Sequence, residues 1–274
     1  MKTVDFPPLG TRIPQVGLGC GRLDGRVMLR HSVRVIETAL ELGIRYFDVA
    51  PLYGMGTAEG ALGSALRGVP DAIIASKVGI PRPPYQPLRA RIRALAKPML
   101  DRSMPAKFML RRLLGRPRAH VEARPMRFSR EEILRSVEDS LRRLRRERID
   151  VLLAHDPVLA DLGAQERLAF EEVVDRGLAR AFGVGTDAVA PPSACGPFGQ
   201  VWQSRWPGES AVADYSRDRM LVFHGVVRSA AAGPAGQIRP HPRELLFRAT
   251  DAAPDALIIV SASTPARLRE LLSR

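Results

Sequence analysis

Residues 45–54 read RYFDVAPLYG, a short apolar strand that ends near a carboxylate and runs into a loop. We expect a strand over 46–50, with Asp48 on it and Tyr53 in the loop that follows. A strand fixes the first group while a loop exposes the second, and this arrangement suits proton-transfer chemistry. The alternative is an ordinary turn with a satisfied Asp48 and a packing Tyr53, because Asp, Pro and Gly are common turn residues.

On both sides of this stretch, apolar runs of strand length alternate with segments of helical periodicity. Strands are expected at 16–21, 46–50, 72–78, 149–155, 180–187, 200–204, 221–227 and 257–262, and helices at 30–43, 57–66, 129–144, 167–177, 209–219, 242–253 and 265–272. Thr57 and Ser129 are the expected N-caps of their helices. The glycines of 17–21 do not have the spacing of a dinucleotide-binding loop. The alternation predicts one domain over 1–274, a parallel, closed (β/α)8 TIM barrel.

One segment interrupts the alternation. Residues 79–127 are basic, rich in proline and too long for an ordinary connection after the third strand. Two interpretations stay open, a lid that faces the substrate and a solvated insertion.

Composition narrows the class of protein. The chain has 274 residues, 45% of them hydrophobic, and no apolar run of the roughly 20 residues that a membrane helix needs. Its first residues lack the apolar core of a signal peptide, so a soluble, cytoplasmic protein is expected. Cys20 and Cys195 are too few and too isolated for a disulfide framework or a zinc site, and no metal is expected.

The charge is strongly positive, at +13 with an isoelectric point near 10.9. Four of the 42 basic residues are lysines, so 38 are arginines, and they are spread along the chain. Aromatic residues make up 5%, which disfavours a stacking platform for single-stranded nucleic acid. Nucleic-acid binding is therefore not the expected main role, despite the charge.

Two further strand ends carry polar residues. Lys77 ends the 72–78 strand in a chain that otherwise uses arginine, and a compact ammonium there can perturb a neighbouring phenol. A lysine at a strand end can also simply reach solvent. His155 ends the 149–155 strand, and a lone histidine in that place is often structural. Active sites of parallel barrels gather at the carboxyl ends of the strands, however, which favours a shared site.

With Asp48, Tyr53, Lys77 and His155 at these strand ends, the chain resembles the aldo-keto reductase family. The residues that match the family's second- and fourth-strand patterns lie at 43–54 and 140–157. The segments 155–157, 183–185 and 204–206 are most similar to the dehydrogenases that act on D-threo-aldoses, L-fucose or L-galactose.

The resemblance implies a role for each of the four residues. Tyr53 would exchange a proton with the carbonyl or alcohol oxygen as hydride moves to or from a nicotinamide. Lys77 would lower the pKa of Tyr53, and Asp48 would hold Lys77 by an ion pair. His155 would donate a hydrogen bond that orients the carbonyl.

The resemblance also implies a dinucleotide site, with NADP as the expected cofactor and NAD as the alternative. Asp187 stands near a place where the family commonly has Asn, and an ionised carboxylate cannot donate the same hydrogen bond. Gln203 and His224 would contact the nicotinamide. Ser263 and Arg267 would hold the adenosine 2′-phosphate, although Ser261 and Leu271 depart from the family pattern beside them.

The sequence ends at Arg274, which we expect to be a shortened C-terminus that leaves the pocket more open, or closed by 79–127 or by a second subunit. The function expected is an NAD(P)-dependent oxidoreductase acting on an aldose or another small aldehyde or ketone. The alternative is a barrel of weak or no activity that senses a nucleotide or interacts with a partner.

Overall fold

The computed structural model describes residues 1–23, 29–82, 128–230 and 240–273. Eight parallel strands close into a barrel in the order β10-β3-β4-β5-β6-β7-β8-β9. Pairing of Ile258 in β10 with Val16 in β3 completes the circle. The strands are β3 (Val16–Gly19), β4 (Tyr46–Asp48), β5 (Ile73–Val78), β6 (Ile149–His155), β7 (Ala179–Gly185), β8 (Val201–Arg205), β9 (Met220–His224) and β10 (Leu257–Val260).

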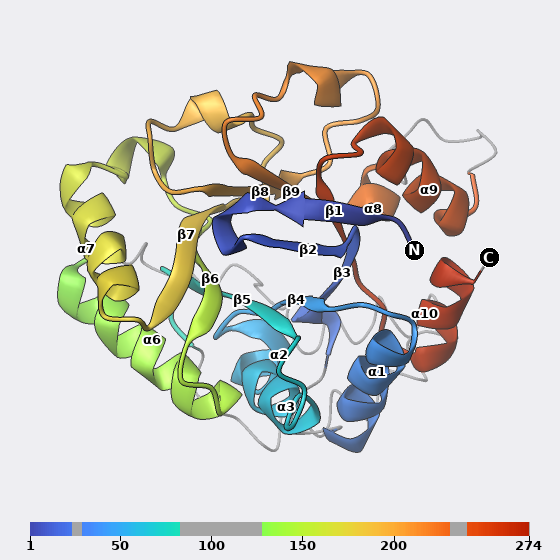
Figure 1. Cartoon of the computed structure of the whole chain (residues 1–274), viewed down its shortest axis with the longest axis horizontal. Coiled ribbons are helices and arrows are strands. Elements are labelled where there is room, and N and C mark those ends of the chain that lie inside the picture. Colours follow the sequence, from blue (N-terminus) through green and yellow to red (C-terminus); the bar gives the residue numbers. More distant parts are fainter. Residues whose placement is uncertain (24–28, 83–127, 231–239, 274) are drawn as a thin grey trace, which may run out of the picture.

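Helices form a layer outside the barrel (Figure 1). They are α1 (Leu29–Glu41), α2 (Tyr53–Gly56), α3 (Ala58–Ala65), α6 (Arg130–Leu144), α7 (Ala164–Asp175), α8 (Val226–Ala230), α9 (Pro242–Ala252) and α10 (Pro265–Leu272). Ser129 caps α6 as expected, because its hydroxyl accepts a hydrogen bond from the Glu132 N–H. Thr57 stands at the N-cap position of α3, but its hydroxyl donates to the carbonyl of Gly54. The predicted (β/α)8 barrel is confirmed.

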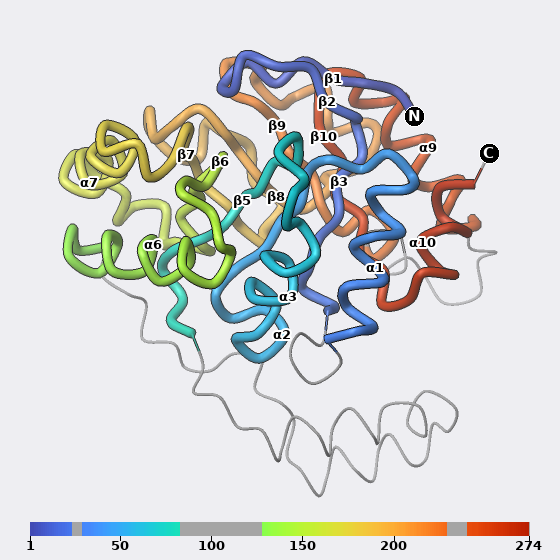
Figure 2. The backbone as a smooth tube through the Cα atoms, turned by 60° about the horizontal axis from the view of Figure 1, so that its bottom comes forward, coloured from blue at the N-terminus to red at the C-terminus, as the bar shows by residue number. Residues whose placement is uncertain are grey.

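The barrel interior is apolar at one end, where an antiparallel hairpin covers it. The hairpin consists of β1 (Thr3–Phe6) and β2 (Thr11–Pro14), and the sequence analysis did not predict it. Val4, Phe6 and Ile13 share a hydrophobic cluster with inward residues of the barrel such as Tyr46, the first residue of β4. The hairpin therefore closes the amino ends of the strands. Figure 2 shows it at the opposite end of the barrel from α2.

One predicted helix is wrong. The segment 209–219 contains only the 3-10 turn η5 (Ala211–Asp214), and the loop before β8 likewise holds the 3-10 turn η4 (Pro192–Ala194). Residues 206–219 lack an apolar stripe at helical spacing. Tyr215 instead packs its ring 5.3 Å from that of Phe223 and covers the outer wall of the barrel there.

Two other expectations stay predictions. Most of the insertion, residues 83–127, lies outside the described part of the chain, and the lid and the solvated loop stay alternative predictions. The single domain over 1–274 stays a prediction for the same reason. Among the helices that the structure describes, none has the length and apolarity needed to cross a membrane.

Candidate active site

The four residues of the predicted tetrad meet at the carboxyl end of the barrel. Asp48 ends β4, Lys77 is the fifth residue of β5, and His155 ends β6. Side chains alternate along a strand, and Ala75 and Leu153 belong to the interior cluster. Lys77 and His155, two residues further on, therefore also face inward. Tyr53 opens α2 directly after β4.

Asp48 and Lys77 form a buried ion pair. The Lys77 Nζ donates to Asp48 Oδ1 and lies 3.3 Å from the carbonyl oxygen of Val49, and the two side chains are only 2% and 6% exposed. Burial alone would lower the pKa of Lys77, but the neighbouring Asp48 and Tyr53 raise it, and the net pKa lies above its ordinary value. Lys77 is therefore a fixed positive charge inside the barrel.

Tyr53 lies against this charge. The Lys77 Nζ is 4.9 Å from the centre of the Tyr53 ring. Burial raises the pKa of Tyr53 and outweighs the lowering by Lys77, so the net pKa lies above 10. The sequence analysis expected Lys77 to lower this pKa. Lys77 does lower the pKa of Tyr53, but burial raises that pKa by more, because ionising a buried phenol is costly. Tyr53 is thus a protonated phenol at neutral pH.

His155 is the edge-on neighbour of Tyr53, with the two ring centres 5.9 Å apart at 88°. Burial, Lys77 and His224 together hold the pKa of His155 well below 6.5, so the imidazole is neutral. Its Nδ1 is buried and has no hydrogen-bond partner among the described residues. A neutral histidine has one ring N–H that can donate and one bare nitrogen that can accept, so it can orient a small polar ligand.

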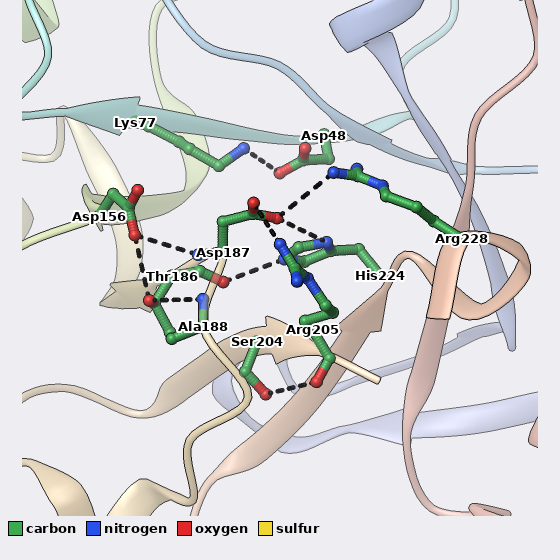
Figure 3. Close-up of polar contacts among 10 residues, drawn as sticks. All are labelled: Asp48, Lys77, Asp156, Thr186, Asp187, Ala188, Ser204, Arg205, His224 and Arg228. Carbon is green, nitrogen blue, oxygen red and sulfur yellow. Dashed lines mark hydrogen bonds and ion pairs between the residues drawn. The ribbon is translucent and has the colours of Figure 1, made fainter. Parts of the chain in front are cut away.

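A second cluster adjoins the tetrad and is centred on Asp187, just after β7 (Figure 3). Arg205 Nη2 donates to Asp187 Oδ2 at 2.5 Å, and Arg228 Nη1 lies 3.8 Å from Oδ1. The Asp187 N–H donates to Asp156 Oδ1 at 3.1 Å, which fixes the start of this loop. Arginine thus contacts both carboxylate oxygens of Asp187.

His224 ends β9 beside this cluster. Its Nε2 contacts the carbonyl of Thr186 at 3.0 Å, so Nε2 carries the proton and donates. Burial lowers the pKa of His224 despite the opposing contacts with Thr186, Asp48 and Asp187. The sequence analysis assigned no role to Arg205, Arg228 or Asp156, although the segments 204–206 and 155–157 that it compared with sugar dehydrogenases contain Arg205 and Asp156. Arg205 could have been placed near Gln203 from the sequence, because it follows Gln203 by two residues and so lies on the same face of the strand.

The other residues expected to bind cofactor are in two places. Gln203 lies in β8 and is buried, and its Oε1 has no partner among the described residues. Ser263 and Arg267 lie at the start of α10, where the Ser263 carbonyl accepts from His31 Nε2 at 2.6 Å. The Arg267 guanidinium is half-exposed and donates to both carboxylate oxygens of Glu270, at 2.6 and 2.7 Å. Arg267 would therefore have to leave Glu270 in order to hold a phosphate.

Several buried polar atoms near the tetrad have no hydrogen-bond partner among the residues that the structure describes, and they bear on whether a polar ligand fits between these residues. His155 Nδ1, Gln203 Oε1 and Arg205 Nε are all buried without a partner in the described chain. Buried polar atoms are normally hydrogen-bonded, and these three lie on strands whose ends meet at the mouth, although six other buried side-chain atoms in the described chain also lack a partner. The donor set suits a nicotinamide and a carbonyl or alcohol substrate.

Comparison with known proteins gives the family. The model of the Aldo/keto reductase family matches residues 15–190. The chain is 30% identical over 188 residues to a D-threo-aldose 1-dehydrogenase of Pseudomonas sp, covering 65% of this chain and 51% of that protein. It is 32% identical over 151 residues to a pyridoxal 4-dehydrogenase of Microbacterium luteolum, covering 54% and 41% respectively. The chain thus spans about half or less of the length of the curated relatives it matches.

Solved structures agree on the fold. The holo form of an aldo-keto reductase from Bacillus halodurans superposes with a TM-score of 0.69 at 19% identity, covering 99% of this chain and 90% of the other. An aldo/keto reductase from Klebsiella pneumoniae in complex with NADP and acetate gives a TM-score of 0.63 at 17% identity, covering 99% and 89%. The predicted resemblance, including the similarity to sugar dehydrogenases, is confirmed by these matches. The chain belongs to the aldo/keto reductase family.

Proposed function

We propose that the protein is an NADP-dependent oxidoreductase that interconverts an aldehyde or ketone and the corresponding alcohol, with an aldose or another small carbonyl compound as substrate. The observation that carries this proposal is the buried Asp48–Lys77 pair against the ring of Tyr53, with the His155 ring edge-on to that of Tyr53. A phenol, a fixed cation and a neutral imidazole around one point are the groups that carbonyl reduction needs.

The nicotinamide, when bound, supplies or accepts the hydride. Tyr53 is protonated at neutral pH and is the proton donor for the carbonyl oxygen in the reductive direction. Lys77 stabilises the negative charge that develops on the Tyr53 oxygen, and Asp48 holds Lys77 in place. His155 is neutral and orients the carbonyl with a hydrogen bond.

Cofactor and substrate are inferred from the site and from the relatives. Arg267 and Ser263 at the start of α10 favour NADP over NAD, because a guanidinium suits the 2′-phosphate. The Klebsiella pneumoniae structure with NADP supports the same choice. The names of the relatives, D-threo-aldose 1-dehydrogenase, pyridoxal 4-dehydrogenase and L-galactose dehydrogenase, support an aldose or a small aldehyde.

The test follows NADPH and NADH at 340 nm with a panel of aldoses, aldehydes and their alcohols. Tyr53→Phe should lower kcat by about 10²- to 10⁴-fold, because the positioned proton donor is lost. Tyr215→Phe is the matched control. Its ring packs against Phe223 in the outer cluster and not against the tetrad, so this change should leave kcat unaltered.

Equal turnover by wild type and Tyr53→Phe would contradict the proposed role of Tyr53. Tight NADPH binding with no turnover of any compound would instead favour a nucleotide-sensing barrel.

A further inference from the structure

The backbone takes an unusual path directly after Tyr53. Gly54 and Met55 have φ angles of 58° and 55°, and Gly56 has φ 82°. Three residues in succession are therefore left-handed, which glycine adopts readily and a residue with a β-carbon does not. A residue such as Met55 keeps this conformation only where the surrounding structure holds it, and residues of this kind cluster at functional sites. Contacts around the turn must therefore fix it.

Two side chains donate hydrogen bonds to backbone carbonyls of this turn. The Thr57 Oγ1 donates to the Gly54 carbonyl at 2.7 Å, and the Arg82 Nε donates to the Gly56 carbonyl at 2.8 Å. The first bond lies within the turn itself. The second comes from a different segment, because Arg82 follows the end of β5 and stands five residues after Lys77. Arg82 thus joins the turn of Tyr53 to the segment that leaves the strand of Lys77.

The start of this segment is fixed beside the tetrad. Gly79 has φ +118°, and a β-carbon at this position would lie 2.7 Å from the Phe128 ring and 3.4 Å from the His155 carbonyl oxygen. A residue larger than glycine would therefore have to displace the aromatic ring. Residues 79–82 run from β5 past the end of β6 to the turn, so their course is set by the strands at one end and by a hydrogen bond at the other.

Tyr53 is the one member of the tetrad that does not lie on a strand, so its position depends on this turn. We propose that Arg82 is a positioning residue for Tyr53. By holding the Gly56 carbonyl, it keeps the left-handed turn in place and the phenol against Lys77. This inference rests on the proposed function. In this role Arg82 acts on the reaction through Tyr53 and not through contact with the substrate.

The competing interpretation is that the exposed Arg82 binds a carboxylate or phosphate of the substrate, because arginine suits both groups. The observed contact favours positioning, since the Nε of Arg82 already donates to a carbonyl of the chain itself. The two roles differ in their kinetic effect. Loss of a group that binds an anion raises KM for anionic substrates, whereas a displaced proton donor lowers kcat for every substrate.

The first experiment measures kcat and KM from NADPH consumption with neutral and carboxylate-bearing aldehydes. Arg82→Met should lower kcat by about 10- to 100-fold with all of them, because the proton donor is misplaced, and should leave KM for NADPH near the wild-type value. Arg82→Lys should recover most of the loss, since an ammonium can donate to the same carbonyl. Arg146→Met is the matched control. Arg146 donates to the Val69 carbonyl at 2.8 Å ahead of β5, so its loss removes the same kind of bond far from Tyr53 and should leave kcat unchanged.

Two double variants test whether Arg82 acts through the turn. In Met55→Gly the left-handed conformation is no longer unfavourable, so adding Arg82→Met should lower kcat by a smaller factor than it does beside Met55. In Tyr53→Phe the positioned group is absent, so adding Arg82→Met should lower the residual kcat no further.

Hydrogen exchange of the protein without cofactor or substrate gives a measurement that does not depend on turnover. The amides of residues 53–57 should exchange about 2- to 10-fold faster in Arg82→Met, as expected for the loss of one hydrogen bond that holds the turn. Exchange of these amides in Arg146→Met should match wild type.

The outcomes separate this inference from the function it rests on. Unchanged kcat in Arg82→Met, or a rise in KM confined to the carboxylate-bearing aldehydes, would overturn the inference and leave the proposed function standing. An equal loss of kcat in Arg146→Met would also overturn it, because the defect would then be a general one. If wild type turns over no compound, the proposed function fails and Arg82 has no reaction to serve. Faster exchange of residues 53–57 in Arg82→Met would then still support its hold on the turn, and unchanged exchange would overturn that as well.

Discussion

Two buried ion pairs lie on opposite faces of the same strand, β5. Lys77 points into the barrel and pairs with Asp48, while its neighbour Ser76 points outward and donates to Glu59 Oε1 at 3.1 Å. The other carboxylate oxygen of Glu59 accepts from Arg143 Nε at 2.7 Å. Glu59 and Asp48 are both almost fully buried, at 1% and 4% exposure. The two carboxylates are about equally buried, but the cations differ: the Arg143 side chain is 19% exposed and that of Lys77 is 2% exposed.

Their surroundings differ. Both oxygens of Glu59 are satisfied, and the pair joins α3 and α6 where Gly63 allows the closest approach, since a β-carbon there would stand 2.4 Å from the Leu144 carbonyl. The Asp48–Lys77 pair instead adjoins the Tyr53 ring and a histidine with an unpartnered nitrogen. A buried ion pair is therefore weak evidence for a site on its own, and unsatisfied polar neighbours make the distinction.

Removing the cation of each pair should give the largest contrast. Lys77→Met should lower kcat by about 10²- to 10⁴-fold, because Tyr53 loses the charge that stabilises its ionised form. Arg143→Met removes the cation that pairs with Glu59 on the outer face of β5, and it should leave kcat near the wild-type value. Turnover is measured at a temperature at which both variants are folded by circular dichroism. A comparable loss of kcat in Arg143→Met would abolish the distinction between the two pairs.

The second contrast is in stability. Glu59→Ala should lower the free energy of unfolding by about 3 kcal/mol, because it leaves the mostly buried Arg143 with only the long 3.9 Å contact to Asp139. The double change Glu59→Leu with Arg143→Met should recover most of that loss, since apolar residues can replace a buried pair. Urea denaturation measures both. If the double variant is no more stable than Glu59→Ala, the pair is not an independent structural unit.

The tetrad could be predicted from sequence because its information is local. Asp48, Lys77 and His155 each end an apolar run, and a parallel barrel brings strand ends together without any knowledge of side-chain contacts. The register of β4, β5 and β6 then follows from the alternation of inward residues.

The remaining features depend on contacts between distant segments. The salt bridge of Arg205 to Asp187 joins the end of β8 to the loop after β7. The hairpin β1–β2 is stabilised by the barrel end that it covers. The prediction of a helix at 209–219 was wrong for a related reason. Tyr215 packs on Phe223, so the segment is held by this contact and not by an apolar face at helical spacing. The net rise in the pKa of Tyr53 was missed because burial, unlike a neighbouring charge, cannot be deduced from a motif.

The smallest contrast is in the pH dependence of stability, and it concerns the histidine beside the Asp48–Lys77 pair. The pKa of His155 is held well below its unfolded value of 6.5, mainly by burial, so the unfolded chain binds more protons than the folded one as the pH falls below 6.5. Stability should therefore decrease with falling pH there, by up to about 1.4 kcal/mol per pH unit for this one group. In His155→Asn that part of the slope should disappear.

Above pH 7 the curves of His155→Asn and wild type should run parallel, because histidine is then neutral in both the folded and the unfolded chain. Urea denaturation at pH 5.0, 5.5, 6.0 and 7.5 gives the slopes, with about one proton fewer taken up on unfolding in the variant at the acidic end. Some slope should remain in the variant, because burial lowers the pKa of His224 as well. Identical slopes in both proteins would mean that His155 can take up a proton inside the fold. The barrel interior beside Lys77 would then tolerate an added charge at the end of β6, and the contrast between the two ion pairs would rest on Tyr53 alone.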